Sequence, residues 1–232
     1  MPPRQQTLLA LGAHFDDCVY GIPGIMIQAL RKDYRVVILS MIGDYRNWPP
    51  AKGRNDAFVA GAKEICMGYG AQMRFLDFAS GRFELNEETK RAVAEVLVDV
   101  KPDIAFYLWR DDHHPDHVAA SAISRAALHL AGRIVDADGY RAPRSFAYDN
   151  GPRHTIGFTP DTFVDVTDEW PDAIEWLGKF AALQRNERFD PAKGPQPNQR
   201  GKEILAAYRG AACGVKYAEA VWSDKSHAQE LL

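Results

Sequence analysis

Apolar runs alternate with stretches of helical periodicity through the first 130 or so residues. Near-continuous apolar runs are typical of strands that helices cover on both faces, and apolar residues three or four positions apart predict helices. The strands are predicted from Leu8 onward and at residues 35–41, 73–78 and 104–109, and the helices at residues 19–32, 54–67 and 117–130 and after Asn86. This alternation predicts an α/β fold, a Rossmann-like doubly wound and mostly parallel sheet with helices on both faces.

The rest of the chain is less regular. Its predicted elements are a short strand at residues 163–166, helices at 168–184 and 204–212, and a loop at 188–201 that is rich in proline, glycine, asparagine and glutamine. That loop is a candidate border for the entrance of a site. We expect a single domain over residues 1–232, with a core at 1–135 and a less regular portion at 136–232 packing on it.

Composition places the chain among ordinary globular proteins, with 46% hydrophobic and 25% charged residues. The net charge of -3 argues against a nucleic-acid partner. Neither a leader-like apolar segment nor a run long enough to span a bilayer stands out, so we expect a cytoplasmic protein without a membrane span. The three cysteines are far apart in the sequence, so neither a disulfide framework nor a thiolate zinc site is predicted.

Polar side chains follow two of the predicted strands, at the point where each strand ends. The carboxyl ends of parallel strands meet at one edge of a sheet, which is where such folds place their active crevice. Imidazole nitrogens and carboxylate oxygens together are what a catalytic zinc-type site needs. The side chains gathered there are His14, Asp16, Asp17, His114, Asp116 and His117.

Three of these residues form a candidate ligand set. His14 and Asp17 are three positions apart in a strand-to-helix turn, and His117 from the second cluster would complete three protein ligands, leaving positions for water and substrate. Asp16 would lie beside the ion and accept a proton as general base. The structural alternative is that the histidines are core or capping residues and that the aspartates cap the next helix. The occurrence of both clusters at the same end of buried strands favours the metal site.

The remaining histidines and the aromatic residues of one loop are weaker candidates. His113 is expected at the surface or behind the ligands, and His129, His154 and His227 have no histidine or carboxylate partner nearby in sequence, which predicts structural or solvated roles. Residues 43–53 are predicted as a loop that leaves the same edge of the sheet. Its Tyr45 and Trp48 are candidate substrate contacts, the alternative being that they pack against their own neighbours.

Two short motifs carry a resemblance to a known family. The sequence AHFDD at residues 13–17 resembles the AHPDD signature of the LmbE-like, or PIG-L, family of metal-dependent de-N-acetylases, and HPDH at 114–117 matches the second signature of that family. The segments FLDF, VDVTD and YAEAVW also look like family segments, in the family's order. The resemblance therefore extends over nearly the whole chain.

The resemblance implies a role for each motif residue. It implies that His14, Asp17 and His117 hold zinc, or another divalent metal such as iron, and that Asp16 is the general base. It further implies that His114 stabilises the oxyanion or protonates the leaving amine, with Asp116 orienting the ring of His114. Arg54 stands near the position of an arginine that contacts substrate in relatives. The candidate substrate contacts are therefore Arg54, Tyr45 and Trp48.

Three positions depart from the family pattern. Phe15 replaces the usual proline and Cys18 the usual glutamate, and Asp112 stands where some relatives have a tyrosine. Neither Phe15 nor Cys18 is a ligand in the family. The change at Cys18 removes a carboxylate that would tune the site, and a role for its thiol as an extra soft ligand is a minor alternative.

These observations predict a zinc-dependent hydrolase that removes an N-acyl group, N-acetyl first of all, from a small sugar-like amide. The alternative is a carbohydrate-binding or regulatory protein that keeps the fold without turnover. Retention of Asp16 and His114 argues against that alternative, since a binding protein needs neither a base nor an oxyanion donor. A dinucleotide-binding role is disfavoured because the first turn, LGAHFDD, lacks spaced glycines. The resemblance also makes a homo-oligomer a candidate assembly.

Overall fold

A computed structural model describes residues 4–223. Seven strands form one sheet in the order β3-β2-β1-β4-β5-β7-β6. Their bounds are β1 Thr7–Gly12, β2 Arg35–Asp44, β3 Gln72–Ala79, β4 Ile104–Leu108, β5 Arg144–Tyr148, β6 Thr162–Asp165 and β7 Ala218–Ser223. Strands β1 to β5 pair in parallel, and β7 pairs antiparallel with both β5 and β6. The sheet is therefore mostly parallel, as the sequence predicts.

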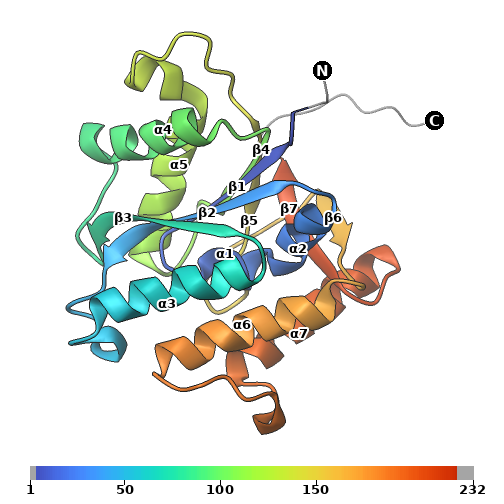
Figure 1. Cartoon of the computed structure of the whole chain (residues 1–232). Helices are drawn as coiled ribbons and strands as arrows, with labels where there is room; N and C mark the ends of the chain where they lie inside the picture. The colour runs from blue at the N-terminus through green and yellow to red at the C-terminus, as the bar shows by residue number, and fades with distance from the viewer. Residues whose placement is uncertain (1–3, 224–232) are drawn as a thin grey trace.

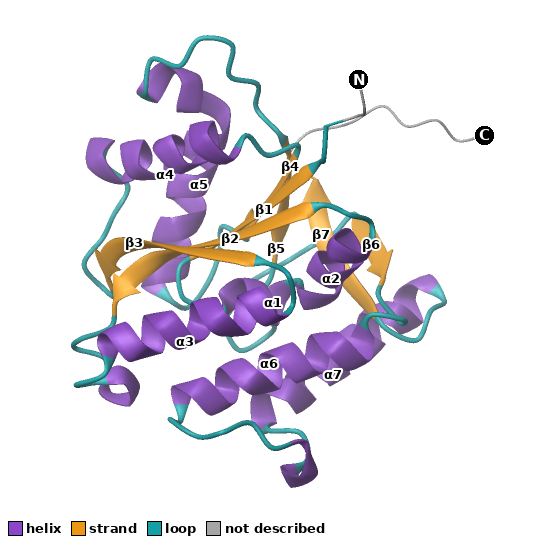
Figure 2. Ribbon diagram, viewed as in Figure 1, coloured by secondary structure: helices purple, strands orange, loops and turns teal. Residues whose placement is uncertain are grey.

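Helices cover both faces of the sheet. Helices α4 and α5 lie on one face, and the other helices gather on the opposite face (Figure 1; Figure 2). The helices are α1 Asp17–Gly21, α2 Pro23–Arg31, α3 Asn55–Gly68, α4 Glu87–Val100, α5 Pro115–Ile134, α6 Trp170–Gln184 and α7 Pro197–Cys213, with 3-10 turns at Pro49–Ala51 and Pro191–Lys193. Every residue of β1 is buried, as the continuous apolar run requires.

Local sequence explains where several helices begin. The side chain of Asn86 accepts a hydrogen bond from the Thr89 amide at 2.9 Å, and the Asn86 amide donates to the Thr89 hydroxyl at 3.1 Å, so this predicted cap starts α4. The helix predicted at residues 19–32 is two helices in the structure, because Pro23 has no N–H to continue the first one and begins α2 instead.

Two further predictions differ from the structure, and two strands were not predicted. Residues 188–201 are not wholly a loop, since α7 begins at Pro197 with the side chain of Gln199 accepting from the Gln196 amide at 2.8 Å. Residues 43–53 include the end of β2 and a 3-10 turn. Strands β5 and β7 were not predicted as strands, and both are short elements whose pairing depends on distant partners.

Candidate functional site

The two predicted motifs meet at one edge of the sheet. Strands β1 and β4 are parallel and paired, so the turn after β1 and the turn after β4 leave the sheet side by side. The first turn carries residues 13–16 into α1, and the second carries residues 109–114 into α5. The topology thus brings together side chains that lie about 100 residues apart in the sequence.

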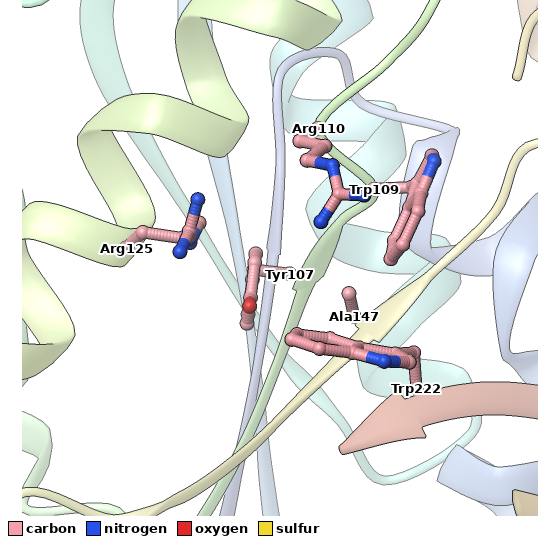
Figure 3. A pocket seen from close by; sticks show the side chains of 6 residues that line it. All are labelled: Tyr107, Trp109, Arg110, Arg125, Ala147 and Trp222. Carbon is pink, nitrogen blue, oxygen red and sulfur yellow. The ribbon is translucent and has the colours of Figure 1, made fainter. Parts of the chain in front are cut away.

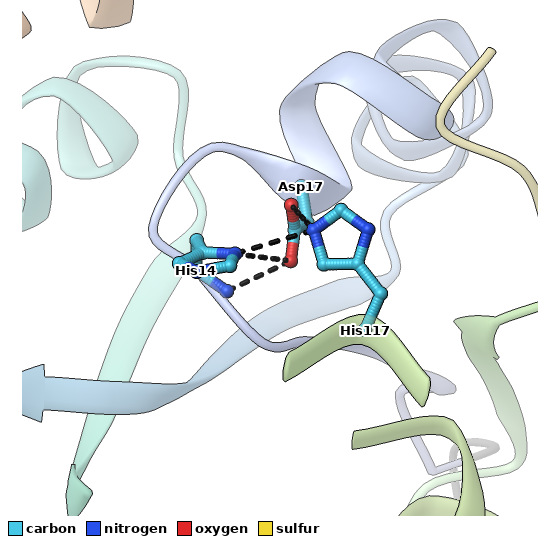
Figure 4. A group of neighbouring side chains, drawn as sticks. All are labelled: His14, Asp17 and His117. Carbon is cyan, nitrogen blue, oxygen red and sulfur yellow. Dashed lines mark hydrogen bonds and ion pairs between the residues drawn. The ribbon is translucent and has the colours of Figure 1, made fainter. Parts of the chain in front are cut away.

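His14, Asp17 and His117 point toward one another (Figure 4). His14 Nδ1 lies 3.2 Å from His117 Nε2, Asp17 Oδ1 lies 3.2 Å from His117 Nε2, and Asp17 Oδ2 lies 3.5 Å from His14 Nδ1. A tetrahedral ion with bonds of ~2.0–2.1 Å places its ligand atoms ~3.4 Å apart. The two histidine nitrogens and the two oxygens of Asp17 therefore lie near the spacing expected of ligands to one small divalent cation, and the three residues could hold a metal ion.

The charge balance of the group also suits a cation. Burial lowers the pKa of His14, but the charge of Asp17 and the contacts with Asp116 and Asp17 outweigh it and raise the pKa to about 9. Burial also lowers the pKa of His117, but the carboxylates of Asp17 and Asp112 outweigh it and raise the pKa to about 10. The carboxylates thus favour positive charge at this point, which a divalent ion would supply.

Asp17 is held from three directions. Its Oδ2 accepts backbone hydrogen bonds from Ala13 at 2.8 Å and His14 at 2.7 Å, and its Oδ1 accepts from Asn150 Nδ2 at 3.0 Å. Burial acts to raise the pKa of Asp17, yet the charges of His117 and His14 hold it well below its ordinary value. Asp17 is therefore an ionised, fixed carboxylate. Asn150 is 133 residues away in the chain, and nothing in the sequence near it signals this contact.

A carboxylate stands behind each histidine of the group. Asp116 Oδ2 lies 3.3 Å from His14 Nε2 and accepts from Ser80 Oγ at 2.6 Å, and its Oδ1 accepts from the Gly81 amide at 2.8 Å. Asp112 Oδ2 lies 3.0 Å from His117 Nδ1. Such partners fix the tautomer and orientation of histidine ligands. Asp112, noted in the sequence only as a departure, therefore has a structural place in the site.

The role expected for Asp116 differs from its observed contacts. Its carboxylate was expected to orient the ring of His114, but it lies 3.9 Å from His114 Nδ1 and closer to His14. The reason is local: His114 is the N-cap of α5, and its Nδ1 accepts the Asp116 backbone N–H at 3.2 Å. The carboxylate of Asp116 is thereby free to turn toward His14.

His114 and Asp16 complete the inner part of the site. The His114 ring stacks on His117 with centroids 4.8 Å apart, and burial together with the charges of His14 and His117 lowers its pKa. Since His114 Nδ1 accepts a hydrogen bond, its neutral ring carries the proton on Nε2. Burial and the charge of Asp17 raise the pKa of Asp16 to about 6, a value suited to a general base.

These residues line a cleft of about 690 Å³. Tyr45 and Trp48 line it as expected, although Tyr45 is buried and its hydroxyl accepts the Phe15 amide at 3.0 Å. Arg54 is not among the lining residues: its guanidinium donates to the carbonyl oxygens of Pro50, Leu183 and Gln184. Residues of the 188–201 segment, which was a candidate border of the entrance, also line the cleft, namely Pro197, Asn198 and Gly201. The lining further includes residues that the sequence did not point to, namely Tyr20, Ser80, Asn150, Arg153, His154 and Gln184.

His154, for which a structural or solvated role was predicted because no partner is near it in sequence, is exposed but has partners from distant segments. Its ring lies 5.2 Å from that of His117, and its Nδ1 lies 3.9 Å from Asp112 Oδ1. His113 is exposed, as expected, and its amide donates to the His154 carbonyl at 2.9 Å. His129 is exposed on α5, and His227 lies outside the described residues.

Cys18 turns away from the candidate metal group. Its Sγ lies 3.3 Å from the Tyr148 hydroxyl, and burial raises the pKa of the thiol. Cys18 is in none of the candidate metal groups among residues 4–223. A neutral buried thiol is a poor ligand, so the soft-ligand alternative has no support in this arrangement.

A second cavity lies between Trp109 just after β4, Ala147 of β5 and Trp222 of β7 (Figure 3). Its volume is about 10 Å³, which is about the space of a single water molecule. The two indole rings meet edge to face with centroids 5.6 Å apart. This cavity is a packing gap rather than a second substrate site.

In the part of the chain that the structure describes, no helix has the length and apolar character needed to cross a membrane.

Known proteins share this fold. The 4-oxalmesaconate hydratase of Pseudomonas putida is 24% identical over 205 residues, covering 79% of this chain and 74% of that protein. The structure of GalB, the 4-carboxy-2-hydroxymuconate hydratase of P. putida KT2440, superposes with a TM-score of 0.79 at 19% identity, over 98% of this chain and 100% of the other. N,N'-diacetylchitobiose deacetylase of Pyrococcus horikoshii gives 0.74 at 17% identity, over 94% and 83%. These structural likenesses establish the LmbE-like fold.

The family itself follows from the sequence match. The profile described as PIG-L, GlcNAc-PI de-N-acetylase, matches residues 9–128, which is more than half of the 232 residues and contains both the 13–17 and the 114–117 motifs. Relatives with this fold are enzymes, both deacetylases and a hydratase. The chain is a member of the PIG-L family.

Proposed function

We propose that the chain is a metal-dependent hydrolase that removes an N-acyl group, N-acetyl in the first instance, from an amine on a small sugar-like molecule. The observation that carries the proposal is the facing trio of His14, Asp17 and His117 inside a cleft, with Asp16 and His114 beside it. The family match and the sugar-deacetylase relative support the same reaction class.

In this proposal the trio holds the ion and the neighbouring residues move protons. A divalent metal such as zinc would supply Lewis acidity, which polarises an amide carbonyl and makes water more acidic. Asp16, ionised above its pKa of about 6, accepts the proton of the attacking water. His114 donates its Nε2–H to the oxygen that becomes negative in the transition state, and the protonated Asp16 can return its proton to the leaving amine.

Asp116 and Asp112 act through the ligands. The contact between Asp116 and His14 Nε2 keeps the His14 Nδ1 lone pair directed at the ion, and the contact between Asp112 and His117 Nδ1 does the same for His117 Nε2. Tyr45, Trp48 and Arg54 stay predictions as substrate contacts. Of these, Arg54 has the weakest support, because its guanidinium is occupied by backbone carbonyls.

A second candidate is hydration of a carbon–carbon double bond. It is favoured by the hydratase relative, which matches 79% of this chain. The same residues suit it, because a Lewis-acid site and a base that activates water serve addition to an unsaturated acid as well as attack on an amide. The two candidates differ in their product: a free amine in one case and a hydroxylated acid in the other.

The test begins with metal analysis of the purified full-length chain, followed by two assays on the metal-loaded protein. Amine release from a panel of N-acetyl sugars and their conjugates supports the hydrolase. Loss of the ultraviolet absorbance of conjugated unsaturated carboxylic acids, without amine release, supports the hydratase. A metal-loaded protein that binds sugars and turns over neither panel supports the non-catalytic carbohydrate-binding alternative. Zinc as the ion, a cytoplasmic location and a homo-oligomer remain predictions.

A further inference from the structure

The charges that line the cleft are unevenly distributed. Its only lining carboxylates within the described residues are Asp16 and Asp17. Asp17 belongs to the candidate metal group, and Asp16 lies beside that group as the proposed base. Two further carboxylates, Asp116 and Asp112, contact His14 and His117 from outside the lining. Arg153 is the one lysine or arginine in the lining, so among the described residues it is the only permanently positive side chain that the cleft wall offers to a ligand.

The loop that carries Arg153 is built into the site. It follows β5, and Asp149 at its start lies 3.0 Å from Arg209 of α7 in a buried ion pair. Asn150 next in the chain donates to Asp17, and its amide donates to Thr155 Oγ1 at 2.9 Å, which closes the loop. Arg153 is thereby presented from a segment bonded directly to the metal group.

The backbone of this loop turns at Gly151, where it passes close to a side chain of the cleft wall. Gly151 has φ +79, and a Cβ there would lie 3.0 Å from the Tyr20 hydroxyl, so the backbone passes close to a lining side chain. The amide of His154 donates to the Gly151 carbonyl at 3.1 Å, and the His154 carbonyl accepts from His113. The loop is anchored on both sides of Arg153, which limits the entropy lost when that side chain binds a ligand.

Within residues 4–223, Arg153 forms no ion pair with a carboxylate. Asp149, the nearest acid along the loop, is paired with Arg209 instead. Arg153 is exposed, and its charge acts on Tyr20, another residue of the cleft wall. Guanidinium groups bind carboxylates and phosphates through paired hydrogen bonds.

We propose that the substrate of this site carries an oxyanion, a carboxylate or a phosphate, which Arg153 binds while the reacting group lies at His14, Asp17 and His117. This inference rests on the proposed function for the position of the reacting group, and it narrows the substrate class from small sugar-like amides in general to anionic ones. The other new lining groups, such as Asn198 and Gln184, are neutral and suit the polar body of such a molecule.

The test measures binding rather than turnover. The metal-loaded full chain is titrated calorimetrically at low salt with N-acetylglucosamine, with its 6-phosphate, and with N-acetylmuramate, which adds a carboxylate. We expect one or both anionic ligands to bind about tenfold or more tightly than the neutral one, as a charge-assisted pair permits. Preference for the phosphate or for the carboxylate identifies which oxyanion the site takes.

Three variants distinguish binding by Arg153 itself from a general effect of the protein's positive charge on anion binding. R153Q should abolish the preference, and R153K should keep part of it because it retains the charge without the paired donors. R91Q removes the same charge from an exposed arginine on α4, away from the lining, and should keep the full preference. The inference is overturned if the unmodified chain binds neutral and anionic ligands equally, or binds neither. It is also overturned if the R153Q variant keeps the preference for anionic ligands. Failure of the amine-release assay overturns the hydrolase proposal and leaves this preference standing.

Discussion

The contact between Asp116 and His14 gives a quantitative prediction about metal affinity. Asp116 is a buried carboxylate that accepts from Ser80 and Gly81 and lies 3.3 Å from His14 Nε2. Burial acts to raise the pKa of Asp116, but the hydrogen bonds from these donors outweigh it and lower the pKa from 3.8 to about 2. A lowering of this size corresponds to roughly 2 kcal/mol, shared among three donors.

Replacing Asp116 by Asn keeps the size of the side chain and removes its charge. The amide has one acceptor oxygen for three donors, so His14 loses the partner that holds its proton on Nε2 and its Nδ1 toward the ion. We expect metal affinity to fall by about tenfold, or about 1.4 kcal/mol, at the lower end of the effects seen when such partners are removed.

The measurement is competition for zinc against a chelator of known affinity at pH 7.5, on the unmodified chain and on D116N. Ser80→Ala is the matched control, because it removes one hydrogen bond from the same carboxylate and leaves its charge and its contact with His14 in place. Thermal unfolding of each metal-free variant separates loss of fold from loss of affinity. An unchanged zinc affinity in D116N, with the fold intact, would refute the role assigned to Asp116.

The remaining predictions concern the base, a ligand and a buried ion pair. Asp16→Ala should abolish amide hydrolysis and keep about one metal per chain, and metal loss on elemental analysis would contradict its assignment as a base that is not a ligand. His117→Ala should lose both metal and activity; full metal content would place the third ligand elsewhere. Because Asp16 must be ionised to accept a proton, kcat/KM should fall as the pH drops through its pKa of about 6, or through a lower value when a cation is bound. A pH profile that stays flat down to pH 4 would exclude that role. The side chain of Glu219 is fully buried and lies 3.1 Å from Lys202 Nζ. Lys202→Met leaves this carboxylate without its cationic partner, so the free energy of unfolding in urea should fall by about 3 kcal/mol. A loss below about 1 kcal/mol would show that the amides at the start of α2 suffice for that carboxylate.

The sequence by itself determined the order of the core elements and the location of the chemistry. Continuous apolar runs and helical spacing reflect burial within a few residues, so β1, β2, β3 and β4 and the helices α3 and α4 were predicted close to their observed bounds. The single helix predicted between β1 and β2 is divided into α1 and α2 at Pro23. The capping box at Asn86 is equally local. Both motifs follow strands, and the carboxyl-edge rule for parallel sheets was enough to predict that they meet.

Only the tertiary structure decided which groups surround those motifs. Asn150 bonds Asp17 from 133 residues away, and its loop brings Arg153 and His154 into the cleft wall. No periodicity signals a single polar contact between distant segments. The same holds for β5 and β7, short strands whose place in the sheet depends on their neighbours rather than on their own five or six residues.

Even within one motif the partner of a side chain depended on the fold. Asp116 lies two residues from His114, yet its carboxylate contacts His14, because capping of α5 occupies His114 Nδ1 and the parallel pairing of β1 with β4 brings His14 closer. Residue type and spacing fix which chemical groups are available. The packing of the strands fixes which of them touch, since hydrogen bonds and ion pairs act only over a few ångströms.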